Sequence, residues 1–117
     1  MIIGALFLAA SPAPLSLEPF MDEEAAAHAL ESHMFCISHV ASEHLNDGQS
    51  PVIIGSEAGR TCDQTGTALR KALADVYRRK PQLLAAGENP DEAAQHYVEG
   101  MNARVEVVIR EERAKKH

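Results

Sequence analysis

The chain has 117 residues, a net charge of −6, 45% hydrophobic residues and no Trp. A chain of this length forms one small domain, and its single core leaves little margin of stability. The acidic balance excludes nucleic acid as a partner, because binding phosphates needs a surplus of Lys and Arg on one face. Much alanine and few aromatic residues favour packed helices over a sheet, so we expect an all-α fold.

The N-terminal segment has the pattern of an export signal. An apolar run from Ile2 to Ala10 precedes small residues and prolines, and it is too short to span a bilayer. No Lys or Arg precedes this run, so either the signal is weak or the true start codon lies upstream of Met1. We expect a signal at 1–13, one helical domain at 14–117, a periplasmic or secreted protein and no transmembrane helix. The alternative is a buried amphipathic segment of a cytosolic protein.

The first helix is predicted to begin between Pro19 and Asp22 and to end near Leu45. Acidic residues at its start complement the positive end of the helix dipole, and the turn sequence Asn46-Asp47-Gly48 stops it. Its apolar residues recur at steps of three and four, which predicts one buried stripe: Leu30, Met34, Ile37, Ala41 and Leu45.

The second helix is predicted to run from a Ser50 N-cap and Pro51 to about Arg79. Gly55 and Gly59 lie beside its stripe, where a missing side chain lets another helix approach. A kink near Gly66 is the alternative to a straight helix. The predicted stripe is Ile54, Ala58, Cys62, Thr65, Leu69, Ala72, Leu73 and Val76.

The third helix is predicted to begin at an Asn89 cap, close to a capping box with Glu92. A short turn at 82–86 and the helix breaker Gly87 precede it. Positive charge at 113–116 suits the negative end of the helix dipole. The buried stripe is predicted to be Ala94, Val98, Met101, Val105 and Val108, with Tyr97 and Ile109 beside it.

Cys36 and Cys62 lie at equal distances from the centre of the turn between the first two helices. In an antiparallel helical hairpin they meet at one level, which predicts a disulfide. The alternatives are two free buried thiols, or a zinc site that joins Cys36, His39 and Cys62. The same register places three acidic residues opposite three basic ones: Asp22, Glu23 and Glu24 face Arg78, Arg79 and Lys80.

Histidines are the most unusual feature of the first helix. None of its four, His28, His33, His39 and His44, has the i, i+4 spacing with which two imidazoles clasp a metal ion. The main interpretation is solvated histidines at the helix edge. The alternative is a loose zinc or copper site formed with the acidic neighbours Glu24, Glu31 and Glu43.

The hairpin resembles a known class of proteins. Cys36, the L-x-D-G-x-S-P pattern at 45–51, Cys62 and the Ala-Leu-Arg run at 68–70 resemble small exported bacterial proteins of unknown function, with one cysteine on each helical arm. The resemblance covers 30–73. It implies a helical fold and an envelope address, and it brings no catalytic residues.

Function is predicted from what the motifs offer. The sequence has no glycine-rich phosphate loop, no G-x-S-x-G elbow and no haem-attachment motif, so we expect neither enzymatic activity nor a cofactor. We expect a three-helix exported protein that binds another envelope protein or serves as a structural component. The alternative function is a small periplasmic protein that binds zinc or copper.

Overall fold

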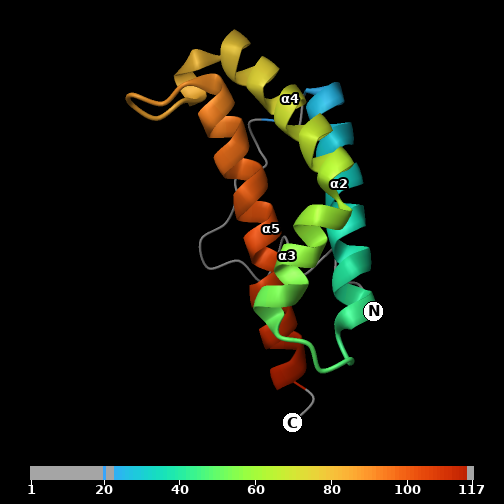
Figure 1. Cartoon of the computed structure of the whole chain (residues 1–117). Coiled ribbons are helices and arrows are strands. Elements are labelled where there is room, and N and C mark those ends of the chain that lie inside the picture. The colour runs from blue at the N-terminus through green and yellow to red at the C-terminus, as the bar shows by residue number, and fades with distance from the viewer. Residues whose placement is uncertain (1–19, 21–22, 116–117) are drawn as a thin grey trace.

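The computed structural model describes residue 20 and residues 23–115, and these form a bundle of helices (Figure 1). The described helices are α2 (Glu24–His44), α3 (Pro51–Thr61), α4 (Asp63–Arg79), the short 3-10 helix η2 (Pro81–Leu83) and α5 (Pro90–Ala114). The predicted all-α fold is therefore confirmed. The predicted signal at 1–13 and Asp22 lie outside the described residues. No helix in the described part of the chain combines the length and apolarity that crossing a membrane requires.

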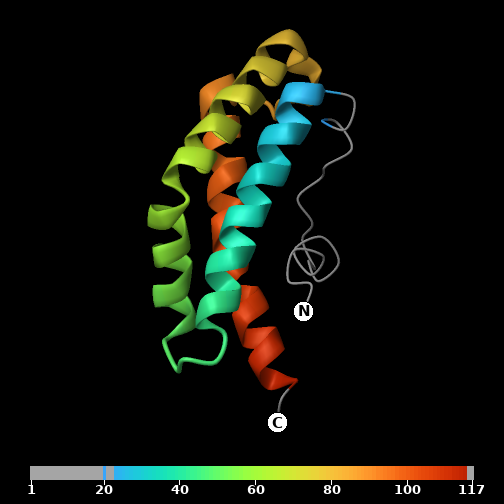
Figure 2. The same ribbon diagram turned by 90° about the vertical axis from the view of Figure 1, so that its right-hand side faces the viewer.

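Three rows of helix pack around a common core (Figures 1 and 2). α2 and α5 run in the same direction, and α3 followed by α4 runs back along both of them. The extents of the molecule are 46 × 26 × 25 Å.

The second predicted helix is in fact two helices, which corrects the expectation of one helix from 51 to 79. The break falls at Cys62, four residues before the kink considered at Gly66. The stretch 59–67 contains two glycines and three threonines, which are weak helix formers and explain the bend. Backbone hydrogen bonds of 2.9 Å still join Cys62 N–H to the Ala58 carbonyl and Gly66 N–H to the Cys62 carbonyl. The chain therefore bends without parting (Figure 2).

The predicted helix boundaries are marked by the expected caps. The Ser50 hydroxyl accepts a hydrogen bond from Val52 N–H at 3.2 Å, and the Asn89 side chain accepts one from Glu92 N–H at 2.8 Å. Gly48 and Gly87 both have φ of +81°, a conformation that glycine adopts without steric cost. The sequence therefore locates these turns to within a few residues.

The core contains most residues of the predicted stripes, although Thr65 and Ala72 of the second stripe are only partly buried. All seven residues predicted for the third helix are buried, as are Leu30, Ile37, Ala41 and Leu45 of the first. Met34 is only partly buried, and His33 is fully buried in its place. At one end of the core, the Phe20 ring packs edge-on against Tyr77 and Tyr97, with centroid distances of 5.7 and 5.5 Å.

The predicted disulfide is confirmed. The sulfur atoms of Cys36 and Cys62 are bonded, and their Cα atoms lie 5.9 Å apart. Cys62 is 1% exposed and lies at the bend between α3 and α4, so the bond ties α2 to the point where the neighbouring row changes direction. Both thiols are consumed, which rules out the zinc site and the free thiols considered for this pair.

The predicted contact between acidic and basic helix ends is confirmed in part. Glu23 lies 2.6 Å from Arg79 and 3.1 Å from Lys80. Hydrogen bonds from Arg79 and then Lys80 lower the pKa of the Glu23 carboxyl. Arg78 was expected to meet the same acidic cluster, but it pairs with Asp91 at the start of α5, at 3.6 Å. Arg78 reaches Asp91 because α5 also packs against α4.

We expect that reducing the disulfide lowers the free energy of unfolding by roughly 3 to 4 kcal/mol, because the cross-link restricts the unfolded chain over a loop of about 26 residues. Urea denaturation with and without a reductant measures the difference. A variant that combines Cys36→Ser with Cys62→Ser should match the reduced protein and ignore the reductant. Coincident curves for the oxidised and reduced protein would show that the disulfide does not stabilise the fold.

Candidate functional site

A buried histidine connects three helices. His33 of α2 is fully buried, and its Nδ1 lies 2.9 Å from the Thr65 hydroxyl of α4. Its Nε2 lies 2.8 Å from Oδ1 of Asn102, which belongs to α5. We call these three residues the His33 cluster. It holds one residue from each row of the bundle, so it fixes how the rows pack.

The proton positions in the cluster follow from its partners. Asn102 Oδ1 can only accept, so Nε2 of His33 carries a hydrogen and donates it. The Thr65 hydroxyl lies 2.9 Å from Nδ1 and 3.0 Å from the Cys62 carbonyl, and its one proton can go to either. With a neutral ring it goes to Nδ1, and the Cys62 carbonyl still accepts Gly66 N–H. A neutral imidazole therefore satisfies the whole cluster.

Protonation of His33 would keep these hydrogen bonds but would place a charge in the core. Nδ1–H would donate to Thr65, and the hydroxyl would turn to the Cys62 carbonyl. Burial lowers the pKa of His33, and the hydrogen bond to Asn102 offsets only part of this effect. The ring is thus held neutral near pH 7 by loss of water rather than by loss of hydrogen bonds.

Gly66 makes room for this ring. A Cβ atom at Gly66 would lie 3.2 Å from Cε1 of His33 and 3.5 Å from Cγ1 of Val98. Gly55 and Gly59 are more loosely placed, because a Cβ there would meet atoms of α5 only at 3.7 Å or beyond. Of these three glycines, Gly66 is the one at which close packing most clearly requires the absence of a side chain.

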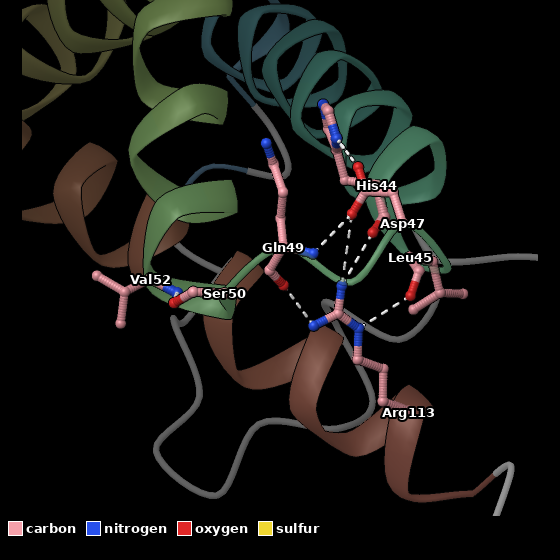
Figure 3. Close-up of polar contacts among 7 residues, drawn as sticks. All are labelled: His44, Leu45, Asp47, Gln49, Ser50, Val52 and Arg113. Carbon is pink, nitrogen blue, oxygen red and sulfur yellow. Dashed lines mark hydrogen bonds and ion pairs between the residues drawn. The ribbon is translucent and has the colours of Figure 1, made fainter.

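Arg113 of α5 caps the end of α2 (Figure 3). Its Nε donates to the Leu45 carbonyl at 2.9 Å, and its other nitrogens donate to the carbonyls of His44 and Gln49 at 3.0 and 2.6 Å. The last carbonyls of a helix have no partner within the helix and carry the negative end of its dipole. A guanidinium satisfies both needs, so Arg113 anchors the hairpin loop to α5.

Asp47 holds the same loop from within (Figure 3). Its carboxylate accepts the Gln49 N–H at 3.0 Å, pairs with the His44 ring and lies 3.8 Å from Arg113. The Gln49 N–H bond and then the His44 contact lower the pKa of Asp47. The L-x-D-G-x-S-P pattern thus folds into a turn that is fixed by local hydrogen bonds and by one distant arginine.

The structure separates the four histidines of the first helix. His33 is buried, whereas His28 and His39 are exposed, and His39 Nε2 lies 3.0 Å from Glu43. His44 pairs with Asp47 at the loop. Among residue 20 and residues 23–115, no three His, Cys, Asp or Glu side chains lie close enough to share a metal ion. The expectation that all four are solvated is wrong for His33, because this residue lies in phase with Leu30 and Ile37.

A shallow open groove follows the contact between α5 and the α3–α4 row. Two adjacent hollows of about 300 and 330 Å³ share Gly59, Glu99 and Asn102. The groove is lined mainly by polar and small side chains, and its lining includes Cys62, whose sulfur is bonded to Cys36.

Three large apolar side chains of the described residues project into solvent. Phe35 of α2 is 77% exposed, and Val52 and Ile53 in the first turn of α3 are 52% and 53% exposed. Phe35 lies two residues from the buried Ile37 and so points away from the core. Of these three side chains, Phe35 is the most exposed.

Four residues of these features were not singled out from the sequence in the roles that the structure gives them: Asn102, Arg113, His33 and Phe35. Asn102 and Arg113 act over separations of 69 and 64 to 69 residues, which no local pattern reveals. His33 and Phe35 could have been identified by fitting the stripe of the first helix more closely. His33 falls within the 30–37–41 phase, and Phe35 falls opposite it.

Comparison with known proteins found no family model, no curated protein and no solved structure that matches this chain. The resemblance to small exported bacterial proteins therefore stays a prediction from the hairpin motif.

We expect the stability of the protein to fall between pH 7.5 and pH 5. The unfolded His33 ring takes up a proton near pH 6.5, whereas the folded ring, whose pKa is lowered by burial, takes up its proton only at lower pH. The unfolded state therefore binds more protons in this window, with a slope of up to about 1.4 kcal/mol per pH unit. Urea denaturation at several pH values measures the slope.

A matched pair of variants assigns this slope to one ring. His33→Gln should flatten it, while His28→Gln, which changes an exposed histidine of the same helix, should leave it in place. The carboxyls with lowered pKa, Glu23 and Asp47, titrate below this window. A slope that persists in His33→Gln would contradict the assignment.

We expect Arg113→Met to destabilise the protein by about 1 to 2 kcal/mol, because three carbonyls lose a charged donor. Thermal unfolding measures the loss, and hydrogen exchange should show faster opening of the loop at 46–50. Arg113→Lys should recover only part of it, since an ammonium lacks the planar fork that reaches several carbonyls. Equal stability of all three proteins would show that the cap is not needed.

Proposed function

We propose that this chain is a non-catalytic protein of the cell envelope, periplasmic or secreted, that binds another envelope protein or supports one structurally. The observation that carries the proposal is the exposure of Phe35 on a helix that is cross-linked through the next residue, Cys36. A cross-linked helix that presents an aromatic side chain is suited to recognition, because little conformational freedom is lost on binding.

The proposed address is supported by the cysteines. Disulfides persist in oxidising compartments and are rare where thiols are kept reduced. A small domain with a single core also gains most from such a cross-link. The export-like pattern at 1–13 adds to this inference, although it lies outside the described residues.

A non-catalytic role is favoured by how the interior polar groups are used. His33 contacts a hydroxyl and an amide inside the bundle, and Arg113 contacts backbone carbonyls. Both residues hold helices together, and neither opens onto a cleft with converging reactive groups. The hydrogen-bonding groups of both side chains therefore stabilise the fold.

Fractionation and affinity capture test the proposal in the native host. We expect the tagged chain in the envelope or secreted fraction, with both cysteines resistant to alkylation until a reductant is added. Chemical cross-linking before capture should then recover one or a few envelope proteins in proportion to the bait. A chain that stays in the cytosol with free thiols, or a bait that recovers no envelope protein, would contradict it.

A further inference from the structure

The exposed side of α2 has a hollow next to Phe35. Phe35 stands beside His28, Glu31 and Ser32, and the four side chains line a hollow of about 350 Å³. His28, Glu31 and Phe35 are exposed, and Ser32 is half-buried. We call these four residues the Phe35 face. These residues form one helix stripe with spacings of three and four, on the side of α2 opposite its buried residues Leu30, His33 and Ile37.

This face is acidic as well as apolar. α2 contains no Lys or Arg, and its carboxylates Glu24, Glu31 and Glu43 are exposed. Glu43 pairs with His39, whereas Glu24 and Glu31 make no ion pair with another described residue. By contrast, the charge of Glu23 at the helix start is used by Arg79 and Lys80. Negative charge around Phe35 is therefore available to a partner.

The Phe35 face is also fixed in position by contacts on the buried side of α2. Cys36 follows Phe35 and is bonded to the α3–α4 bend, and the His33 ring is hydrogen-bonded to two other helices. Both ties lie within one turn of Phe35. An aromatic anchor fixed in this way contributes more to affinity than one that must be ordered on binding.

We propose that the Phe35 face binds a basic amphipathic segment of a partner protein. An apolar side chain of that segment would occupy the hollow beside Phe35, and Lys or Arg side chains would reach Glu31 and Glu24. This inference rests on the proposed function and names the chemistry of its partner. Charge complementarity selects this occupant, because steering by opposite charge raises the association rate and suppresses partners of like charge.

The charge also argues against two other occupants. An anionic lipid surface would be repelled by Glu24 and Glu31. A second copy packed face to face would place the same carboxylates against each other, since a two-fold interface brings one patch onto itself. The basic segment is the occupant that relieves the charge and covers the aromatic ring.

A designed peptide tests the chemistry directly. The probe is a fluorescent 15-residue peptide of Lys and Leu, with leucines spaced by three and four residues, and it is titrated with the intact oxidised protein. We expect saturable binding that Phe35→Ser weakens by at least about fivefold, as truncation of an aromatic anchor does. Replacing Glu24 and Glu31 together by Gln should weaken it by a similar factor and reduce its salt dependence.

Matched control variants test whether binding depends on the Phe35 face or only on the net negative charge and exposed apolar area of the protein. Ile53→Ser removes another exposed apolar side chain, and Glu92→Gln with Glu99→Gln removes two exposed carboxylates of α5. Both should leave the affinity within about twofold, which supports the assigned face. No saturable binding, equal losses in test and control variants, or equal binding of a Glu and Leu peptide would overturn the proposal.

A photo-cross-linker placed at position 35 in the native host distinguishes this proposal from the broader one. Cross-links to a Lys- or Arg-rich apolar segment of an envelope protein support both. Capture of an envelope protein that survives Phe35→Ser, with no cross-link from position 35, overturns the Phe35 face and leaves the proposed function standing. Cross-links to lipid or to a second copy overturn the basic segment as occupant.

Discussion

The seam between α2 and the α3–α4 row is the constraint on which the rest of this structure depends. Cys36 and Cys62 lie 13 residues on either side of residue 49, and His33 and Thr65 lie 16 residues on either side of it. The covalent tie and the hydrogen-bonded tie therefore occupy neighbouring levels of one register. The ion pairs of Glu23 with Arg79 and Lys80 lie at the end of the same seam. These residues are about one helical turn out of the common register, and their long side chains span the difference.

A histidine in this seam specifies the packing in a way that an aliphatic residue would not. A Leu at position 33 could be buried in several registers, whereas the imidazole is satisfied only where Thr65 and Asn102 both reach it. A slip of either neighbouring row would leave a buried nitrogen without a partner, at a cost of about 1 to 3 kcal/mol. Gly66 belongs to the same arrangement, because its missing side chain admits the ring.

Much of the fold could be predicted from the sequence because its signals are local. The caps at Ser50 and Asn89, the turn glycines and the stripe of the third helix depend on residues within one or two turns. The disulfide was also predictable, since equal spacing about a short turn is enough to place two cysteines opposite each other. The bend at Cys62 was missed because each weak helix former near it is tolerable alone, and only their sum breaks the helix.

The candidate surface was harder to predict. The apolar periodicity of a helix identifies its buried residues, but it does not distinguish an exposed residue that contacts a partner from one that does not. Phe35 is recognisable from the sequence only when the stripe of the first helix is fitted with His33 inside it, since the two residues then lie on opposite sides of the helix. With the phase fixed, the inner side of α2 is accounted for by the core, the disulfide and the His33 cluster. The opposite side is not accounted for in this way: there Phe35 and Glu31 are exposed on one stripe, and Glu31 makes no ion pair with another described residue. Because the buried polar groups of α2 already hold the helices in place, the proposed recognition role depends on this exposed stripe and not on the interior of the bundle.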